Sequence, residues 1–282
     1  MGELVRSLPE GEQVRGRVCG VTLLADELYL LRDKGCDQVE VYDVINYRLK
    51  RHLTVPNDGV TAPGICTVAD MTSCTHYRCV YISHHIGNCI HRLDAQGIFT
   101  RWAVNDEPQG LSVNAAHNVI VTCRVVRKIK EFSSDGNLLH ELILPDDVIH
   151  PLHAIQTRSG QFIVCHGDLG DPVHRVCMMS SDGGRIVHSH GGQSGSHAGQ
   201  YDVPVRLAVD GNESVFVADR NNRRVTLLSP TLEYVGQAVS RDQLKWQPRR
   251  LCFDPGRRLL YVAENEWKDG KCTAGRVVVF SV

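Results

Sequence analysis

The chain has 282 residues, of which 42% are hydrophobic and 22% are charged, and this mixture excludes an intrinsically disordered protein. Its formal net charge of −1 excludes a strong overall attraction to nucleic acid or anionic lipid and leaves only a local basic surface. No segment approaches the roughly 18 apolar residues of a membrane helix, and no apolar signal segment follows Met1. We therefore expect a cytoplasmic protein without a membrane partner.

The predicted elements are all strands. A short strand is expected at Leu4–Leu8, and six copies of a strand-turn-strand pattern follow, from RVCGVTLLADELYLL through PVRLAVDGNESVFVADRNNRRVTLLSP to QPRRLCFDPGRRLLYVAENEW. Aligning the copies places one residue of each at an equivalent position: Cys19, Met71, Gly110, His153, Arg206 and Arg250. Their spacing of about 39 to 53 residues is that of propeller blades.

This pattern predicts an all-β, six-bladed propeller that forms a single domain over residues 1–282. The expected blades are residues 14–58, 59–105, 106–148, 149–200, 201–245, and 246–282 together with 3–8. The last copy ends without an outer strand, so we expect Leu4–Leu8 to complete it. Ring closure protects the strand edges and needs no second chain, which favours a monomer.

The fifth copy resembles an NHL repeat, because its P-V-R-L-A-V-D and V-A-D-R-N-N-R-R-V segments match the elements of that repeat. In the sixth copy Glu264 and Asn265 replace the Asp and the following polar residue. Six such blades are similar to the propeller of tripartite-motif NHL proteins. The resemblance implies a module that binds RNA or protein, as the substrate-recognition part of a larger ubiquitin-ligase-type protein.

Basic residues are expected to gather on one face of the disc. In a propeller, the loops that lead into the first strands and those that join the second and third strands open on the same face. The predicted ligand-binding residues are Arg206, Arg250, Arg249, His153, Arg124, Arg127, Lys128, Arg220, Arg223, Arg224, His84, His166 and Arg175. This charge asymmetry predicts binding of an anionic ligand, either RNA or a protein or peptide.

Two other interpretations of these charges stay open. The loop cations can be solvated or paired within their own blade, as Arg224 with Asp219, and the same face can bind protein alone as a scaffold. We favour a non-enzymatic recognition module without catalytic residues or cofactor.

A metal-dependent enzyme is the alternative. His84, His153 and His166 can converge at the channel, and peptide-amidating lyases use channel histidines of a propeller. A second zinc candidate is the cysteine group Cys66, Cys74, Cys79 and Cys89. It lacks a C-x₂-C pair and has strand-like spacing, so we expect packed thiols and no metal.

Overall fold

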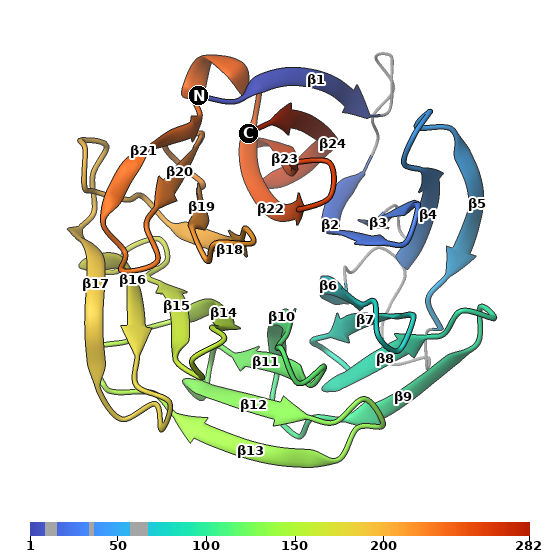
Figure 1. The fold of residues 1–282 in the computed structure, drawn as a ribbon, viewed down its shortest axis with the longest axis horizontal. Helices are drawn as coiled ribbons and strands as arrows, with labels where there is room; N and C mark the ends of the chain where they lie inside the picture. Colours follow the sequence, from blue (N-terminus) through green and yellow to red (C-terminus); the bar gives the residue numbers. More distant parts are fainter. Residues whose placement is uncertain (9–15, 34–36, 57–66) are drawn as a thin grey trace.

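Six four-stranded antiparallel sheets surround a central axis, as Figure 1 shows. The computed structural model describes residues 1–8, 16–33, 37–56 and 67–282. Within these residues the only helix is the 3₁₀ turn η1 (Arg241–Gln243), and no helix is long and apolar enough to cross a membrane. The predicted all-β, six-bladed propeller is confirmed.

The first three blades run in chain order from the innermost strand to the outermost. Blade 1 contains β2 (Arg17–Leu24), β3 (Glu27–Asp33), β4 (Asp37–Asp43) and β5 (Leu49–Thr54). Blade 2 contains β6 (Val68–Cys74), β7 (Cys79–His84), β8 (Cys89–Leu93) and β9 (Phe99–Ala103). Blade 3 contains β10 (Pro108–Val113), β11 (Val119–Cys123), β12 (Lys128–Phe132) and β13 (Leu138–Ile143).

The next two blades repeat this order, and the sixth ends with a strand from the start of the chain. Blade 4 contains β14 (Pro151–Gln156), β15 (Phe162–His166), β16 (Val173–Met179) and β17 (Ile186–Gln193). Blade 5 contains β18 (Pro204–Val209), β19 (Val215–Asp219), β20 (Arg224–Leu228) and β21 (Tyr234–Val239). Blade 6 contains β22 (Gln247–Asp254), β23 (Leu259–Lys268), β24 (Lys271–Ser281) and β1 (Glu3–Leu8).

β1 closes the ring. It pairs antiparallel with β24, from Glu3 opposite Ser281 to Leu8 opposite Val277. The Gly2 amide also donates to the Ala238 carbonyl at 2.6 Å, which ties the start of the chain to blade 5. The predicted closing strand at Leu4–Leu8 is confirmed, and the first and last blades are thereby held together.

Burial follows the position of each strand in its blade. The second strands are apolar runs rich in β-branched residues, such as VFVAD in β19 and VIVTC in β11, and every residue of these two is buried. Outermost strands such as β5 (LKRHLT) are mostly exposed. A strand that is covered on both faces needs a continuous apolar run, whereas an outer strand can carry charges.

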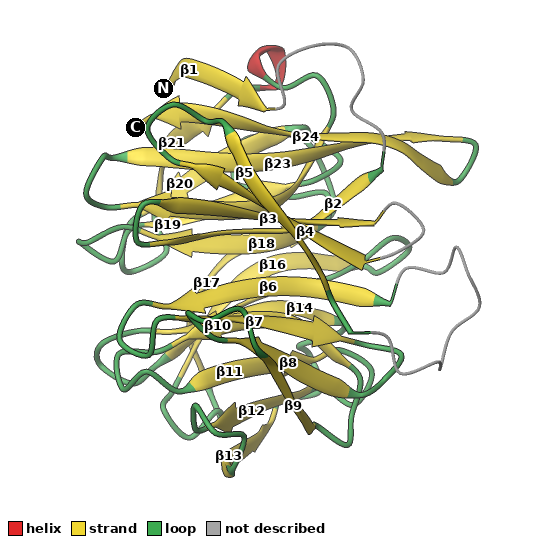
Figure 2. Cartoon of the chain, turned by 90° about the vertical axis from the view of Figure 1, so that its right-hand side faces the viewer, coloured by secondary structure: helices red, strands yellow, loops and turns green. Residues whose placement is uncertain are grey.

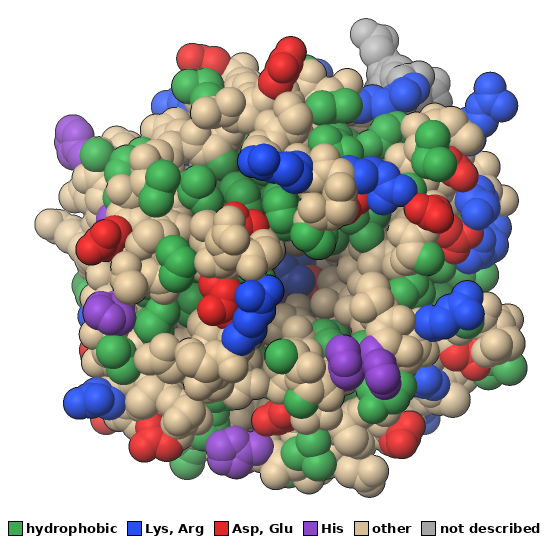
Figure 3. All heavy atoms as spheres, in the orientation of Figure 1, with side chains coloured by type: hydrophobic (Ala, Val, Ile, Leu, Met, Phe, Trp, Pro, Cys, Tyr) green, Lys and Arg blue, Asp and Glu red, His purple; other side chains and the backbone are tan. Residues whose placement is uncertain are grey.

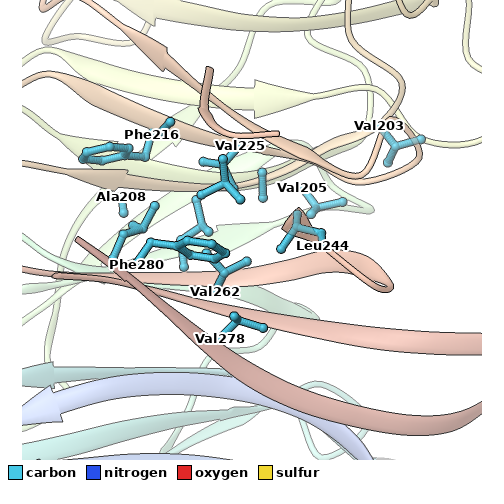
Figure 4. Close-up of a cluster of buried hydrophobic side chains, with 14 residues drawn as sticks. Val203, Val205, Ala208, Phe216, Val225, Leu244, Val262, Val278 and Phe280 are labelled. Carbon is cyan, nitrogen blue, oxygen red and sulfur yellow. The ribbon is translucent and has the colours of Figure 1, made fainter. Parts of the chain in front are cut away.

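Six hydrophobic clusters fill the junctions between neighbouring blades. Figure 4 shows the cluster between blades 5 and 6, where Phe216 and Val225 lie opposite Val262 and Phe280. Each cluster takes its side chains from two blades, so no blade has a core of its own. The sheets are therefore stabilised mainly by stacking around the ring.

The two faces of the disc carry different loops. Figure 2 shows the disc from its edge, with the β23–β24 hairpin projecting from one face. The first strands begin at that face, which we call the mouth face. The turns between first and second strands lie on the opposite face, toward the viewer in Figure 1.

Candidate functional site

Each blade has a β-bulge near the start of its first strand. The register between first and second strands shifts by one residue at the same place in all six blades. The extra residues are Cys19, Ala69, Gln109, Leu152, Val205 and Arg249. A bulge redirects a side chain, and five of these six residues line one cavity at the end of the central channel.

The bulges correct the alignment of the repeats. The equivalent residues, each directly after the bulge, are Gly20, Asp70, Gly110, His153, Arg206 and Arg250. The predicted alignment is right at four positions and wrong by one residue at Cys19 and Met71. The first strands of blades 3 to 6 contain a proline just before the bulge, whereas Val18 and Val68 stand there in blades 1 and 2.

The cavity at the mouth has a volume of about 210 Å³. Of the twelve described residues that line it, half are arginines and one, Asp168, is acidic. The arginines are Arg17, Arg124, Arg206, Arg220, Arg249 and Arg250. The remaining polar residues are His85 and Gln109. A strongly basic cavity therefore lies at the centre of a chain that is almost neutral overall.

Asp70 lies below this cavity and connects its own blade 2 to three others. Its fully buried carboxylate accepts hydrogen bonds from Arg206 Nη1 and, at 2.6 Å, from the Leu111 amide. Arg250 Nε lies 3.2 Å from the second carboxylate oxygen and also donates to the Cys19 carbonyl at 2.6 Å. Burial lowers the pKa of Arg250, and the attraction of Asp70 opposes that effect. One carboxylate thus pairs with two guanidinium groups and offsets part of their charge.

Asp168 occupies the rim. Its side chain pairs with Arg124 at 2.8 Å and with Arg220 at 3.6 Å. The Asp171 carboxylate accepts the Asp168 amide at 2.7 Å and contacts His150 Nδ1 at 2.7 Å. These contacts hold the rim loop so that the Asp168 carboxylate faces two arginines.

Arg249 has no acidic partner among the residues that the structure describes. Its Nε is buried without a hydrogen bond, and its guanidinium carbon lies 4.8 Å from the centre of the Trp267 ring. Burial, followed by repulsion from Arg220 and Arg250, lowers its pKa to about 9. Arg249 is thus a cation held by an aromatic ring at the mouth, with hydrogen-bonding capacity unused.

Five of the thirteen sequence-predicted residues line this mouth: Arg124, Arg206, Arg220, Arg249 and Arg250. Four others are engaged in ion pairs at 2.8 Å, namely Arg127 with Asp146, Lys128 with Glu141, Arg175 with Asp147, and Arg224 with Asp219. Arg223 contacts the Arg241 carbonyl at 3.4 Å. The positive charge of the mouth face is consequently concentrated at its centre.

The NHL-like residues of blade 5 fasten a loop. Asp219 accepts hydrogen bonds at 2.8 Å from Asn222, Arg224 and the Asp202 amide, and Arg224 Nη2 reaches the Gln200 carbonyl at 2.7 Å. Arg224 is therefore paired within its own blade, as one of the two other interpretations of the loop cations expected. In blade 6, Glu264 takes the same role with Arg276.

The predicted channel histidines point to separate partners. His84 Nδ1 accepts from the Gly87 amide at 2.8 Å, and His166 Nε2 accepts from Arg175 Nε at 3.1 Å. His153 Nε2 lies 3.0 Å from the Leu111 carbonyl. In the described part of the chain, no three or more His, Cys, Asp or Glu side chains are grouped as metal ligands.

The described members of the cysteine group are not part of a group of metal ligands either. Cys74, Cys79 and Cys89 are buried free thiols, and Cys66 lies outside the described residues. Burial raises the pKa of Cys79 and of Cys89, as expected for packed thiols.

Asp70, Arg17 and Gln109 are mouth or floor residues that the sequence prediction missed. An acidic residue in the apolar strand VADMTSC was a usable signal for Asp70, because a buried carboxylate requires a cationic partner. No sequence signal marks Gln109, since its position at the mouth depends on the bulge.

A second cavity opens at the other end of the channel. Figure 3 shows the hollow at the centre of that face, and its volume is about 460 Å³. His153 and Arg206 lie at its inner end, and hydroxyl groups line its wall. The hydroxyls already bond between blades, Thr22 to Ser73 at 2.9 Å and Ser112 to the Ala154 carbonyl at 2.8 Å. The mouth cavity is the stronger candidate because its donors are less fully used.

No protein-family model matches the chain, and no curated protein sequence matches it. Solved structures do. Virginiamycin B lyase from Staphylococcus aureus aligns over 100% of both chains with a TM-score of 0.65 and 11% identity. A streptogramin B lyase covers 98% of this chain and 86% of its own, with a TM-score of 0.65 and 13% identity. Kuenenia stuttgartiensis hydrazine synthase covers 99% of each, with a TM-score of 0.64 and 12% identity.

At these identities the likeness shows the fold alone. It nevertheless corrects one prediction. We expected a propeller of this kind to be a binding platform and not an enzyme, and that inference is wrong because lyases have the same fold along the whole chain. The resemblance to tripartite-motif NHL propellers stays a prediction.

Proposed function

We propose that this protein is an NHL-like propeller whose mouth binds an anionic group carried by its partner. The observation that carries the proposal is a set of buried nitrogen atoms that have no hydrogen-bond partner among the described residues. Three are arginine donors, Arg124 Nε, Arg206 Nε and Arg249 Nε, and the fourth is His85 Nδ1, which donates only in the tautomer that carries its proton there. All four residues line the mouth cavity. Leaving such groups unsatisfied costs about 1–3 kcal/mol each, which an anion with several acceptor oxygens would offset.

The charges of the mouth support the same function. Asp70 and Asp168 pair with four of the six arginines, and Arg249 has no acidic partner within the described residues. Burial lowers the pKa of Arg220 and Arg250, and lowers that of Arg249 to about 9, which still leaves it protonated at neutral pH. A bound anion relieves this repulsion and forms charge-assisted hydrogen bonds.

The size of the cavity defines what enters it. A volume of about 210 Å³ is below the roughly 300–1,000 Å³ of pockets that enclose drug-sized ligands. The mouth therefore takes one projecting group, from RNA or from an acidic protein segment, and leaves the rest of the partner outside. The proposal concerns this binding step, which recognition and catalysis share.

The test measures the affinity of two anionic probes, a single-stranded RNA oligonucleotide and an aspartate-rich peptide, at low and moderate salt. Arg249→Gln and Arg220→Gln should each lower the affinity for the probe that binds by about 10-fold or more. The reason is that a hydrogen bond to a charged group contributes about 1.5–3 kcal/mol. Affinity should also fall as salt rises.

Arg127→Gln is the matched control. Arg127 lies in a loop of the same face but does not line the mouth, and it is paired with Asp146. Its variant should bind within about twofold of the unmodified protein, given the small contribution of exposed pairs. Absence of binding by both probes, or equal losses in the control and mouth variants, contradicts the proposal.

A further inference from the structure

The mouth donors surround the channel axis instead of lying on one side. Arg17 belongs to blade 1, His85 to the β7–β8 loop of blade 2, and Arg124 to the β11–β12 loop of blade 3. Arg220 lies in the β19–β20 loop of blade 5, and Arg249 lies in β22 of blade 6. Five of the six blades thus contribute a nitrogen-bearing side chain to one cavity. A ligand at its centre is approached from several directions at once.

The buried nitrogen atoms that have no partner among the described residues have the same distribution. The four buried nitrogen atoms without partners belong to blades 2, 3, 5 and 6, on His85, Arg124, Arg206 and Arg249. Arg206 is 5% exposed, and its Nε is shielded from bulk solvent. A ligand that satisfies atoms on different blades must present oxygens in several directions around the channel axis.

This requirement distinguishes between the common biological anions. A carboxylate has two oxygens in one plane and suits a single bidentate arginine. A phosphate monoester carries three terminal oxygens around its ester bond and a charge of about −1.5 to −2 near neutral pH. Donors arranged in a ring match the second geometry, with the ester bond directed out of the channel.

The floor and the volume limit how deep the anion goes. Asp70 below the mouth is already paired with Arg206 and Arg250 and accepts the Leu111 amide. A volume of about 210 Å³ corresponds to roughly seven water molecules at about 30 Å³ each. A phosphate with its first substituent fits that space, and the Asp168 carboxylate at the rim is occupied by Arg124 and Arg220.

We propose that the mouth selects the terminal phosphate of a phosphate monoester, with arginines from opposite blades around its three free oxygens. The inference rests on the proposed function and narrows it from any anion to one chemical group. The group can be the end of a small molecule, a phosphorylated side chain or a 5′-phosphate, since all three present the same three oxygens.

The experiment compares matched probes by titration calorimetry with the full chain. The probes are a phosphoserine peptide beside its glutamate and serine counterparts, a 5′-phosphorylated oligonucleotide beside its 5′-hydroxyl form, and inorganic phosphate beside acetate. The phosphorylated member of at least one pair should bind 10-fold or more tighter than its glutamate or hydroxyl counterpart. The pair with the larger ratio identifies the source of the phosphate.

The variants test the geometry. Arg249→Gln and Arg220→Gln should each reduce the preference for phosphate by about 10-fold, and Arg249→Lys should restore only part of it because lysine lacks the planar fork. Arg127→Gln should keep the full preference. Two arginines on different blades guard against the misfolding of a single variant.

Three results would overturn the inference in distinguishable ways. Equal binding of glutamate and phosphoserine peptides that is still lost in Arg249→Gln removes phosphate selection and leaves the anion-binding function intact. A phosphate preference that survives both arginine substitutions places the selective site elsewhere. No binding by any anionic probe removes both the inference and the proposed function.

Discussion

Asp70 has no acidic counterpart in the other five blades. The equivalent residues there are Gly20, Gly110, His153, Arg206 and Arg250. A buried arginine needs a partner because its charge is costly to desolvate, and the single carboxylate supplies one for blades 5 and 6 together. Six similar blades therefore do not produce a channel with sixfold symmetry. The equivalent position is an aspartate in one blade, an arginine in two, a histidine in one and a glycine in two.

Buried neutral histidines are the second residue-scale feature, and they make stability depend on pH. Burial lowers the pKa of His91 and of His166 to about 4. His166 Nε2 accepts a hydrogen bond from Arg175, which requires an unprotonated nitrogen. In the unfolded chain both rings have a pKa near 6.5, so below that pH the unfolded state takes up protons that the folded state refuses.

We predict that the free energy of unfolding is unaffected by these histidines above pH 6.5. It should fall as pH decreases from about 6.5 to about 4, by up to about 1.4 kcal/mol per pH unit for each histidine. Urea unfolding between pH 4.5 and 7.5 measures this slope. His166→Gln should reduce this slope by the equivalent of up to one proton. A slope identical to that of the unmodified chain would show that His166 does not contribute to the pH dependence.

At the scale of elements, β1 has an effect out of proportion to its length. It covers β24 along five residue pairs, and Leu8 is buried in the cluster between blades 6 and 1. Deleting residues 1–8 should lower the melting temperature by about 10 °C or more. The lost burial of a leucine contributes about 1.5–3 kcal/mol and the lost strand pairing adds to it, at about 2–4 °C per kcal/mol for a chain of this size.

Removing only Met1, which is 87% exposed, is the control and should leave the melting temperature unchanged. Circular dichroism or differential scanning fluorimetry is sufficient for both variants. An intact melting temperature after deletion of residues 1–8 would mean that β1 does not hold the ring closed.

The first strands show how far sequence patterns reach. Pro108, Pro151, Pro204 and Pro248 mark the start of these strands in blades 3 to 6, and the alignment is right in those blades. Valines replace the proline in blades 1 and 2, and the alignment misses by one residue. A bulge adds a residue without changing the apolar alternation that follows, so spacing alone does not locate it.

The site was harder to predict than the strands for a related reason. Topology alone places the loop cations on one face, and five of thirteen predicted residues line the mouth. Which of them are neutralised depends on loops that bring Arg127 to Asp146 and Arg175 to Asp147. Such pairs join residues 19 and 28 positions apart, and no periodicity in the sequence encodes them.

For the whole molecule, the shared clusters determine how the ring unfolds. Open repeat arrays fray from their terminal repeats and lose cooperativity. Here β1 joins the first and last blades, and a hydrophobic cluster fills every junction. A blade that opens must break two junctions at once, so no blade has a natural position at which unfolding begins.

We therefore predict one cooperative transition, whichever junction is weakened. Phe280→Ala weakens the cluster between blades 5 and 6, and Ile82→Ala weakens that between blades 1 and 2. Both side chains are fully buried, so each variant should lose about 2–5 kcal/mol and melt about 4–20 °C lower. In scanning calorimetry each should keep a van't Hoff enthalpy equal to the calorimetric one. Two resolved transitions in either variant would contradict the prediction, because they would show that part of the ring unfolds separately.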